Sequence, residues 1–128
     1  PRDRRQRQMC IRDSICRNWR FKTPQIAEKS AVSIYHMYRG FRALRDFIGM
    51  DMCRKFLEMG FTRARRYANH KNGKKYKDGK ILPQENDWAT NEKAKAASIF
   101  KIFRDKVTKD PKYQSMRANW RELENVSN

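Results

Sequence analysis

The sequence has few of the residues that build disulfide frameworks, metal sites and membrane spans. It holds three cysteines and two histidines, and no CxxC pair or Cys/His cluster has the spacing of a zinc site. No apolar run approaches the length of about eighteen residues that marks a transmembrane helix. The P-loop, GxGxxG and HExxH motifs are also missing. We therefore expect no cofactor, no membrane partner and no activity that depends on these motifs, and a reducing, cytoplasmic environment.

Acidic residues are scarce as well. Against 31 Lys and Arg there are only 14 Asp and Glu, so the formal net charge of the 128-residue chain is +17. The length fits one domain with a modest core, and the aromatic residues are spread along the chain, which argues against global disorder. A folded domain with this excess of positive charge favours a polyanionic partner, nucleic acid above all.

Residues 4–14 have an order that no folding argument explains. They match, codon by codon, the translation of a common transposase-type library adapter. A basic nucleic-acid arm or an Arg-rich targeting peptide would explain the charge but not this order. We therefore expect residues 1–14 to be a non-native tail on a metagenomic open reading frame whose true N-terminal part is missing. Residues 15–128 keep 26 Lys and Arg and 12 Asp and Glu, a net charge of +14.

The first half of the remaining chain is predicted to hold three helices after an extended lead-in over residues 15–22. Thr23 and the proline after it resemble an N-cap and first helical position, and apolar residues then recur at helical spacing to residue 41. A second helix is expected from Asp46, as its cap, to Gly60, which would terminate it. A short third helix is expected over residues 62–70.

The second half is predicted to hold a basic loop and two more helices. Residues 71–80, rich in Lys and Gly, indicate a loop or small hairpin. A fourth helix is expected from near Thr90, and a fifth from Asp110–Pro111, which repeats the signal of a cap followed by proline. Residues 125–128 are expected to fray. The predicted fold is mainly α: a single domain over residues 15–124, built as a bundle of four to five helices.

The strongest concentration of charge lies in residues 62–80, TRARRYANHKNGKKYKDGK. Eight basic residues and one acidic residue give this segment a net charge of +7. Guanidinium groups bind phosphates in bidentate fashion, lysines add mobile charge, and tyrosines can stack on unpaired bases. The predicted nucleic-acid-binding residues are Arg63, Arg65, Arg66, Tyr67, His70, Lys71, Lys74, Lys75, Tyr76, Lys77 and Lys80. The sequence does not distinguish DNA from RNA.

Other interpretations of the charged residues stay open. Clustered lysines are often only solvated surface, and a tyrosine such as Tyr67 inside a helix is as readily explained by core packing. An acidic protein partner would suit the same surface. Asp51 and Glu58 lie at heptad spacing and raise the alternative of a divalent-metal nuclease, although two such acids are also an ordinary helix face. No nucleophile or paired carboxylate can be assigned to a catalytic site, so we expect a non-enzymatic protein.

Three segments resemble a known family. They are WRFKTP at residues 19–24, GMDMCRKFLEMGFTRARRYANH at residues 49–70, and the stretch from Lys74 to Pro83. The family is the domain-of-unknown-function family 4385, which occurs in bacteria, some eukaryotes and tailed phages. The resemblance covers residues 19–113 and implies an intact domain type, with a bacterial cell or a phage-infected host cell as its setting. It supplies no activity and no catalytic or cofactor residue.

Overall fold

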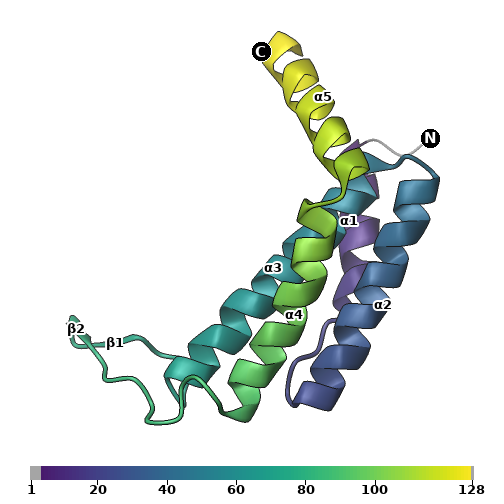
Figure 1. Ribbon diagram of the computed structural model, residues 1–128. Coiled ribbons are helices and arrows are strands. Elements are labelled where there is room, and N and C mark those ends of the chain that lie inside the picture. Colours follow the sequence, from purple (N-terminus) through teal and green to yellow (C-terminus); the bar gives the residue numbers. More distant parts are fainter. Residues whose placement is uncertain (1–3, 128) are drawn as a thin grey trace.

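The computed structural model describes residues 4–127, and helices dominate it. A two-stranded antiparallel hairpin lies between the third and fourth helices (Figure 1). The elements in chain order are α1 (Arg4–Cys16), α2 (Pro24–Ala43), α3 (Phe47–Asn69), β1 (Tyr76–Lys77), β2 (Lys80–Ile81), α4 (Glu92–Thr108) and α5 (Pro111–Ser127). The predicted fold class, a small helical bundle with a basic loop or small hairpin before its fourth helix, is confirmed, and the segment forms the hairpin.

Helix α3 is the centre of the bundle. It packs most extensively on α4 and then on α2, while α1 covers a further side of it (Figure 1). The apolar stripes expected from helical spacing meet in one core. Its largest fully buried side chains are Tyr38, Tyr113, Phe100, Ile15, Ile34, Met50, Leu57, Val107 and Cys53. Burial alone raises the pKa of the Cys53 thiol to about 12, as expected for a cysteine that acts as a small apolar residue.

The N-terminal residues are more ordered than expected. Ile15 and Cys16 form the last turn of α1 and not the start of an extended lead-in. The reason is packing: Ile11 and Ile15 lie four residues apart on one face of α1 and are buried in the common core. Arg7 also forms an ion pair with Asp46, at the start of α3. The foreign origin of residues 1–14 stays a prediction; residues 1–3 lie outside the described part of the chain.

The helix starts predicted from capping residues are confirmed. The Thr23 side chain accepts a hydrogen bond of 3.2 Å from the backbone N–H of Ile26, and Pro24 is the first residue of α2. The Asp46 side chain accepts one of 3.3 Å from the backbone N–H of Gly49. Helix α4 begins at Glu92, near the expected start, and the Asn91 side chain supplies the capping oxygen.

The predicted break at Gly60 is wrong. Helix α3 continues without interruption to Asn69, so the expected third helix at residues 62–70 forms its last turns. Gly60 does not adopt the left-handed conformation that ends helices. A Cβ atom at this position would lie 2.6 Å from Cδ1 of Phe100, in α4. Its missing side chain therefore serves close packing of α3 on α4, and not helix termination.

A carboxylate at the α4–α5 junction links three helices. Asp110 accepts hydrogen bonds from the Tyr38 hydroxyl at 2.5 Å and from Nε of Arg42 at 2.7 Å, both on α2. Its second oxygen accepts one from the backbone N–H of Lys112, in the first turn of α5. Burial by itself would raise the pKa of Asp110, but these hydrogen bonds lower it to about 2.

Helix α5 extends away from the bundle beyond this junction (Figure 1). It continues to Ser127, past the point at which we expected fraying. Near its end, Glu124 accepts a hydrogen bond of 2.9 Å from Nε1 of Trp120 and pairs with Arg4 at 3.1 Å. These two contacts stabilise the last turns of α5, for which the sequence indicated no interaction. Among residues 4–127, no helix combines the length and apolar character needed to cross a bilayer.

Candidate nucleic-acid interface

The basic hairpin forms one end of the molecule. Tyr76 pairs with Ile81 and Lys77 with Lys80 across the two short strands. Asp78 and Gly79 make the turn with φ angles of 51° and 79°, the left-handed values that a two-residue hairpin turn requires. The hairpin and the loop before it expose the residues predicted for phosphate binding: Lys71, Lys74, Lys75, Tyr76, Lys77 and Lys80.

Two of the predicted binding residues are engaged in contacts within the protein. The guanidinium of Arg65 donates to Oδ1 of Asn69 at 3.0 Å and to the backbone carbonyl of Trp88, and it lies 5.6 Å from the centre of the Trp88 ring. His70 is only 8% exposed and caps the end of α3, where its backbone N–H donates to the Arg66 carbonyl. Arg65 therefore holds the loop before α4 on α3, and His70 is buried beneath the surface that we expected it to join.

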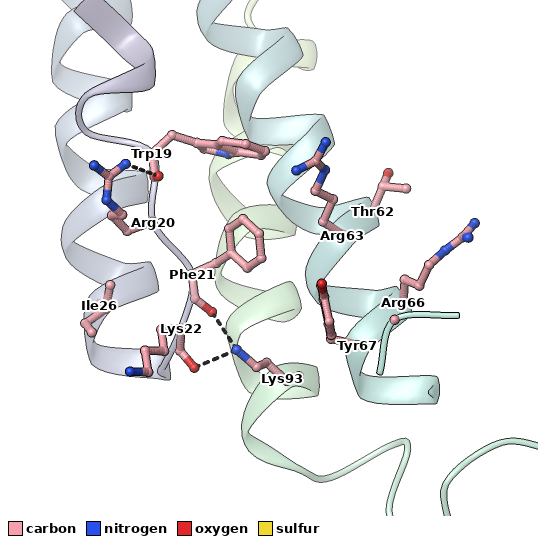
Figure 2. Close-up of a pocket in the computed structure, with 11 residues that line it drawn as sticks. Trp19, Arg20, Phe21, Lys22, Ile26, Thr62, Arg63, Arg66, Tyr67 and Lys93 are labelled. Carbon is pink, nitrogen blue, oxygen red and sulfur yellow. Dashed lines mark hydrogen bonds between the residues drawn. The ribbon is translucent and has the colours of Figure 1, made fainter. Parts of the chain in front are cut away.

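The other helical members of the predicted set line a pocket. Arg63, Arg66 and Tyr67 of α3 form one side of it (Figure 2). The opposite side comes from the α1–α2 connection, from α2 and from α4. The pocket has a volume of about 830 Å³ and is completed by Trp19, Arg20, Phe21, Lys22, Ile26, Thr62, Gly73 and Lys93. Tyr67 is 41% exposed, so the interpretation that placed it in the core is not the one the structure adopts.

Sequence reasoning missed the contribution of the α1–α2 connection and of Lys93. The mixture of aromatic and basic residues at 17–22 was visible, but it lies some forty residues from Arg63 in the chain. Only the packing of α1 and α2 around α3 brings Trp19 against that arginine and Phe21 into the same pocket. Lys93 carried no signal of its own, because it is one of several lysines in α4.

Packing and a hydrogen bond fix the aromatic wall of the pocket. Nε1 of Trp19 donates to the Phe56 carbonyl at 3.1 Å. The Trp19 ring meets Phe56 and Phe21 edge to face, with centroid distances of 5.5 and 5.3 Å. The guanidinium of Arg63 lies 5.2 Å from the centre of the Trp19 ring. Trp19 is thus a fixed platform that positions both Phe21 and Arg63 at the pocket.

The pocket concentrates positive charge. Five of its lining residues are Lys or Arg, and none of the described residues that line it is Asp or Glu. Nζ of Lys93 donates to the carbonyls of Lys22, at 2.8 Å, and of Phe21, at 3.5 Å. The side chains of Lys22, Arg63 and Arg66 form no hydrogen bond or ion pair with any residue in 4–127. Positive charge without a nearby carboxylate attracts anions to the pocket.

The carboxylates considered for a metal site are held in ion pairs. Asp51 accepts hydrogen bonds from Nε of Arg54 at 2.9 Å and from the Tyr113 hydroxyl at 2.7 Å. Burial would raise the pKa of Asp51, but these two hydrogen bonds lower it. Glu58 pairs with Arg104 of α4 at 3.1 Å. Within residues 4–127, no three His, Cys, Asp or Glu side chains gather as metal ligands.

Comparison with known proteins adds one match. A family model described as "Domain of unknown function (DUF4385)" matches residues 9–123, which is nearly the whole chain and includes every residue of the pocket and hairpin. No curated protein and no solved structure matches.

Proposed function

The chain belongs to the DUF4385 family, and since that description specifies no activity, we propose from the geometry of the pocket and hairpin that the protein is a non-enzymatic nucleic-acid-binding domain. The interface consists of the pocket and the adjoining hairpin, which we call the basic face. Binding is carried mainly by phosphate contacts, so it is salt-sensitive and largely independent of sequence.

The observation that carries this proposal is that Lys and Arg side chains without ion-pair partners, together with exposed aromatic rings, continue from the pocket into the hairpin. Arg66 and Tyr67 line the pocket from α3, and Gly73, in the loop that leads to the hairpin, lines it from the other side of Tyr67. The exposed hairpin lysines follow directly, and Nζ of Lys75 lies 5.6 Å from the centre of the Tyr76 ring. A solvated surface needs no pocket, whereas a nucleic acid offers both the phosphates and the base faces that such a site can bind.

The test is fluorescence anisotropy with labelled single-stranded DNA, duplex DNA and RNA, each titrated over a range of salt concentrations. We expect dissociation constants on the order of micromolar at low salt, rising steeply with added salt. Charge reversal by Arg66→Glu with Lys77→Glu should weaken binding to all three polymers alike. It should also reduce the slope of log K against log salt by roughly two, one for each phosphate contact.

A matched control comes from the other end of the bundle. Arg39 on α2 and Arg121 on α5 are exposed cations outside the basic face, so Arg39→Glu with Arg121→Glu changes the net charge equally. If this control weakens binding as much as the first variant does, binding depends on the net charge of the protein and not on the basic face. An absence of binding at low salt to every polymer would refute the proposed function. A protein captured from a lysate in a form that survives nuclease treatment would then favour an acidic protein partner.

A further inference from the structure

We infer that the pocket binds one unpaired nucleotide of a strand, with its base against Phe21 and Tyr67 and its phosphate on Lys93. This inference rests on the proposed function and makes it more specific. It requires the protein to prefer single strands, because a base inside a duplex has both faces covered by its neighbours. The hairpin lysines would bind the phosphates that follow along the same strand.

The pocket has the size and composition of a ligand site. Its volume of about 830 Å³ lies within the range of roughly 300–1,000 Å³ that is usual for small-molecule and cofactor sites. Three aromatic residues and an isoleucine supply apolar surface. Five Lys or Arg residues also line the pocket, of which Arg20 donates hydrogen bonds to the carbonyls of Cys16 and Trp19. A nucleotide has the same division, a flat apolar base joined to an anionic phosphate.

Two of the three rings are arranged to receive a base. Trp19 is already covered by Phe56, Phe21 and the Arg63 guanidinium, so it acts as the wall behind the site. Phe21 and Tyr67 line the pocket from different elements (Figure 2), and Phe21 also packs edge to face on Phe100 with a centroid distance of 6.5 Å. The Tyr67 ring is supported by Gly73, where a Cβ atom would come within 2.8 Å of it, and its hydroxyl has no hydrogen-bond partner among the described residues. Stacking on such rings tolerates any base.

Lys93 lies where it can bind the phosphate of a nucleotide whose base contacts Phe21 and Tyr67. Its Nζ lies 6.0 Å from the centre of the Phe21 ring and 5.9 Å from that of Tyr67, so a phosphate on Lys93 would sit beside both rings. An ammonium group has three protons, and two of those on Lys93 are given to backbone carbonyls of the α1–α2 connection. The third proton remains for a ligand. Arg66, which has no hydrogen-bond or ion-pair partner in residues 4–127, extends away from Lys93 (Figure 2), so it would contact a neighbouring phosphate of the same strand.

The discriminating experiment compares four ligands by anisotropy or by competition: a 15-nucleotide oligothymidylate, a duplex of the same length, an abasic 15-mer with the same phosphates, and thymidine monophosphate. We expect the order oligothymidylate, then duplex and abasic polymer together, with the mononucleotide far weaker. Tyr67→Leu should weaken oligothymidylate binding roughly tenfold and leave the duplex and abasic polymer unchanged. Tyr67→Phe, which keeps the ring, should retain the affinity.

The outcomes separate this inference from the proposed function. Equal binding of the single strand, duplex and abasic polymer, with no effect of Tyr67→Leu, would overturn the nucleotide pocket and leave polyanion binding standing. Competition by thymidine monophosphate at the same concentration as the oligomer would overturn the assignment to a strand and identify a free nucleotide as the ligand. No binding to any polymer would overturn both. Circular dichroism and thermal unfolding of each variant verify that the fold is intact.

Discussion

Two glycines inside helices should respond to the same substitution with opposite signs. Gly40 lies in α2 and Gly60 in α3, and neither has a positive φ angle. A Cβ atom at position 40 would meet no atom within 4 Å, whereas at position 60 it would lie 2.6 Å from Cδ1 of the fully buried Phe100. Helix propensity favours alanine at both sites, so any difference in sign reports on packing between α3 and α4.

The magnitudes follow from these surroundings. Gly40→Ala should raise the free energy of unfolding by about 0.5–1 kcal/mol, because alanine loses less conformational entropy on folding. Gly60→Ala gains the same propensity but forces the Phe100 ring to move by roughly 1 Å, and overpacking of this kind costs about 1–3 kcal/mol. We therefore expect a net loss of about 1–2 kcal/mol at position 60.

Urea denaturation followed by circular dichroism at the helix band measures both changes, with the slope m compared to confirm two-state unfolding. The control is the double variant Gly60→Ala with Phe100→Leu. Because leucine removes the ring edge, the double variant should lose less stability than the two single losses combined. If Gly60→Ala instead stabilises the protein as Gly40→Ala does, α3 and α4 do not approach each other at this point, and the explanation for the continuous helix fails.

Three further outcomes are expected. Hydrogen bonds from Arg42 and Tyr38 lower the pKa of Asp110 from 3.8 to about 2 in the folded protein, so the stability that Asp110 contributes is present above about pH 4 and is lost as the pH falls toward 2. Asp110→Asn should therefore reduce the free energy of unfolding at neutral pH and make it depend less on pH between 4 and 2. An acid unfolding profile unchanged by this substitution would contradict the assignment. Ile11→Ala should lower the free energy of unfolding in urea by about 2 kcal/mol, because Ile11 is buried in the core; no loss would mean that α1 is not docked. Gly73→Ala, at a φ of 73° and against a tyrosine ring, should cost about 1–2 kcal/mol and weaken single-strand binding as well, which anisotropy would detect.

Local signals in the sequence were sufficient for the helix starts and for a turn region in residues 71–80, which the sequence left open as a loop or a small hairpin. Thr23 and Asp46 have side-chain oxygens that can accept a backbone hydrogen bond within the next turn, so their effect depends only on neighbouring residues. The Asp78–Gly79 pair likewise favours the φ angles that its turn adopts. Gly60 was misinterpreted because a glycine that ends a helix and one that permits close packing are the same residue in the sequence; Phe100, forty residues away, decides between them.

The candidate site combines residues that the sequence singled out with residues that it did not. The density of Lys and Arg after Thr62 predicts an exposed basic segment without any knowledge of the fold, because charged side chains are rarely buried. The pocket depends on residues near Trp19 and on Lys93, and only tertiary packing brings them to α3. The same packing gives two predicted residues contacts within the protein: Arg65 contacts Trp88, and His70 is buried. Neither change has a local signal.

The projecting α5 has a consequence for how the molecule moves in solution. Its 17 residues extend about 25 Å as a helix, at about 1.5 Å per residue, and the hairpin lies at the opposite end of the bundle (Figure 1). Such an elongated particle has a higher frictional ratio than a sphere of 15.5 kDa, so it should elute early in gel filtration and rotate faster about its long axis than across it. Because one carboxylate, that of Asp110, ties the base of α5 to α2, its hydrogen bonds help to set the hydrodynamic length of the whole protein.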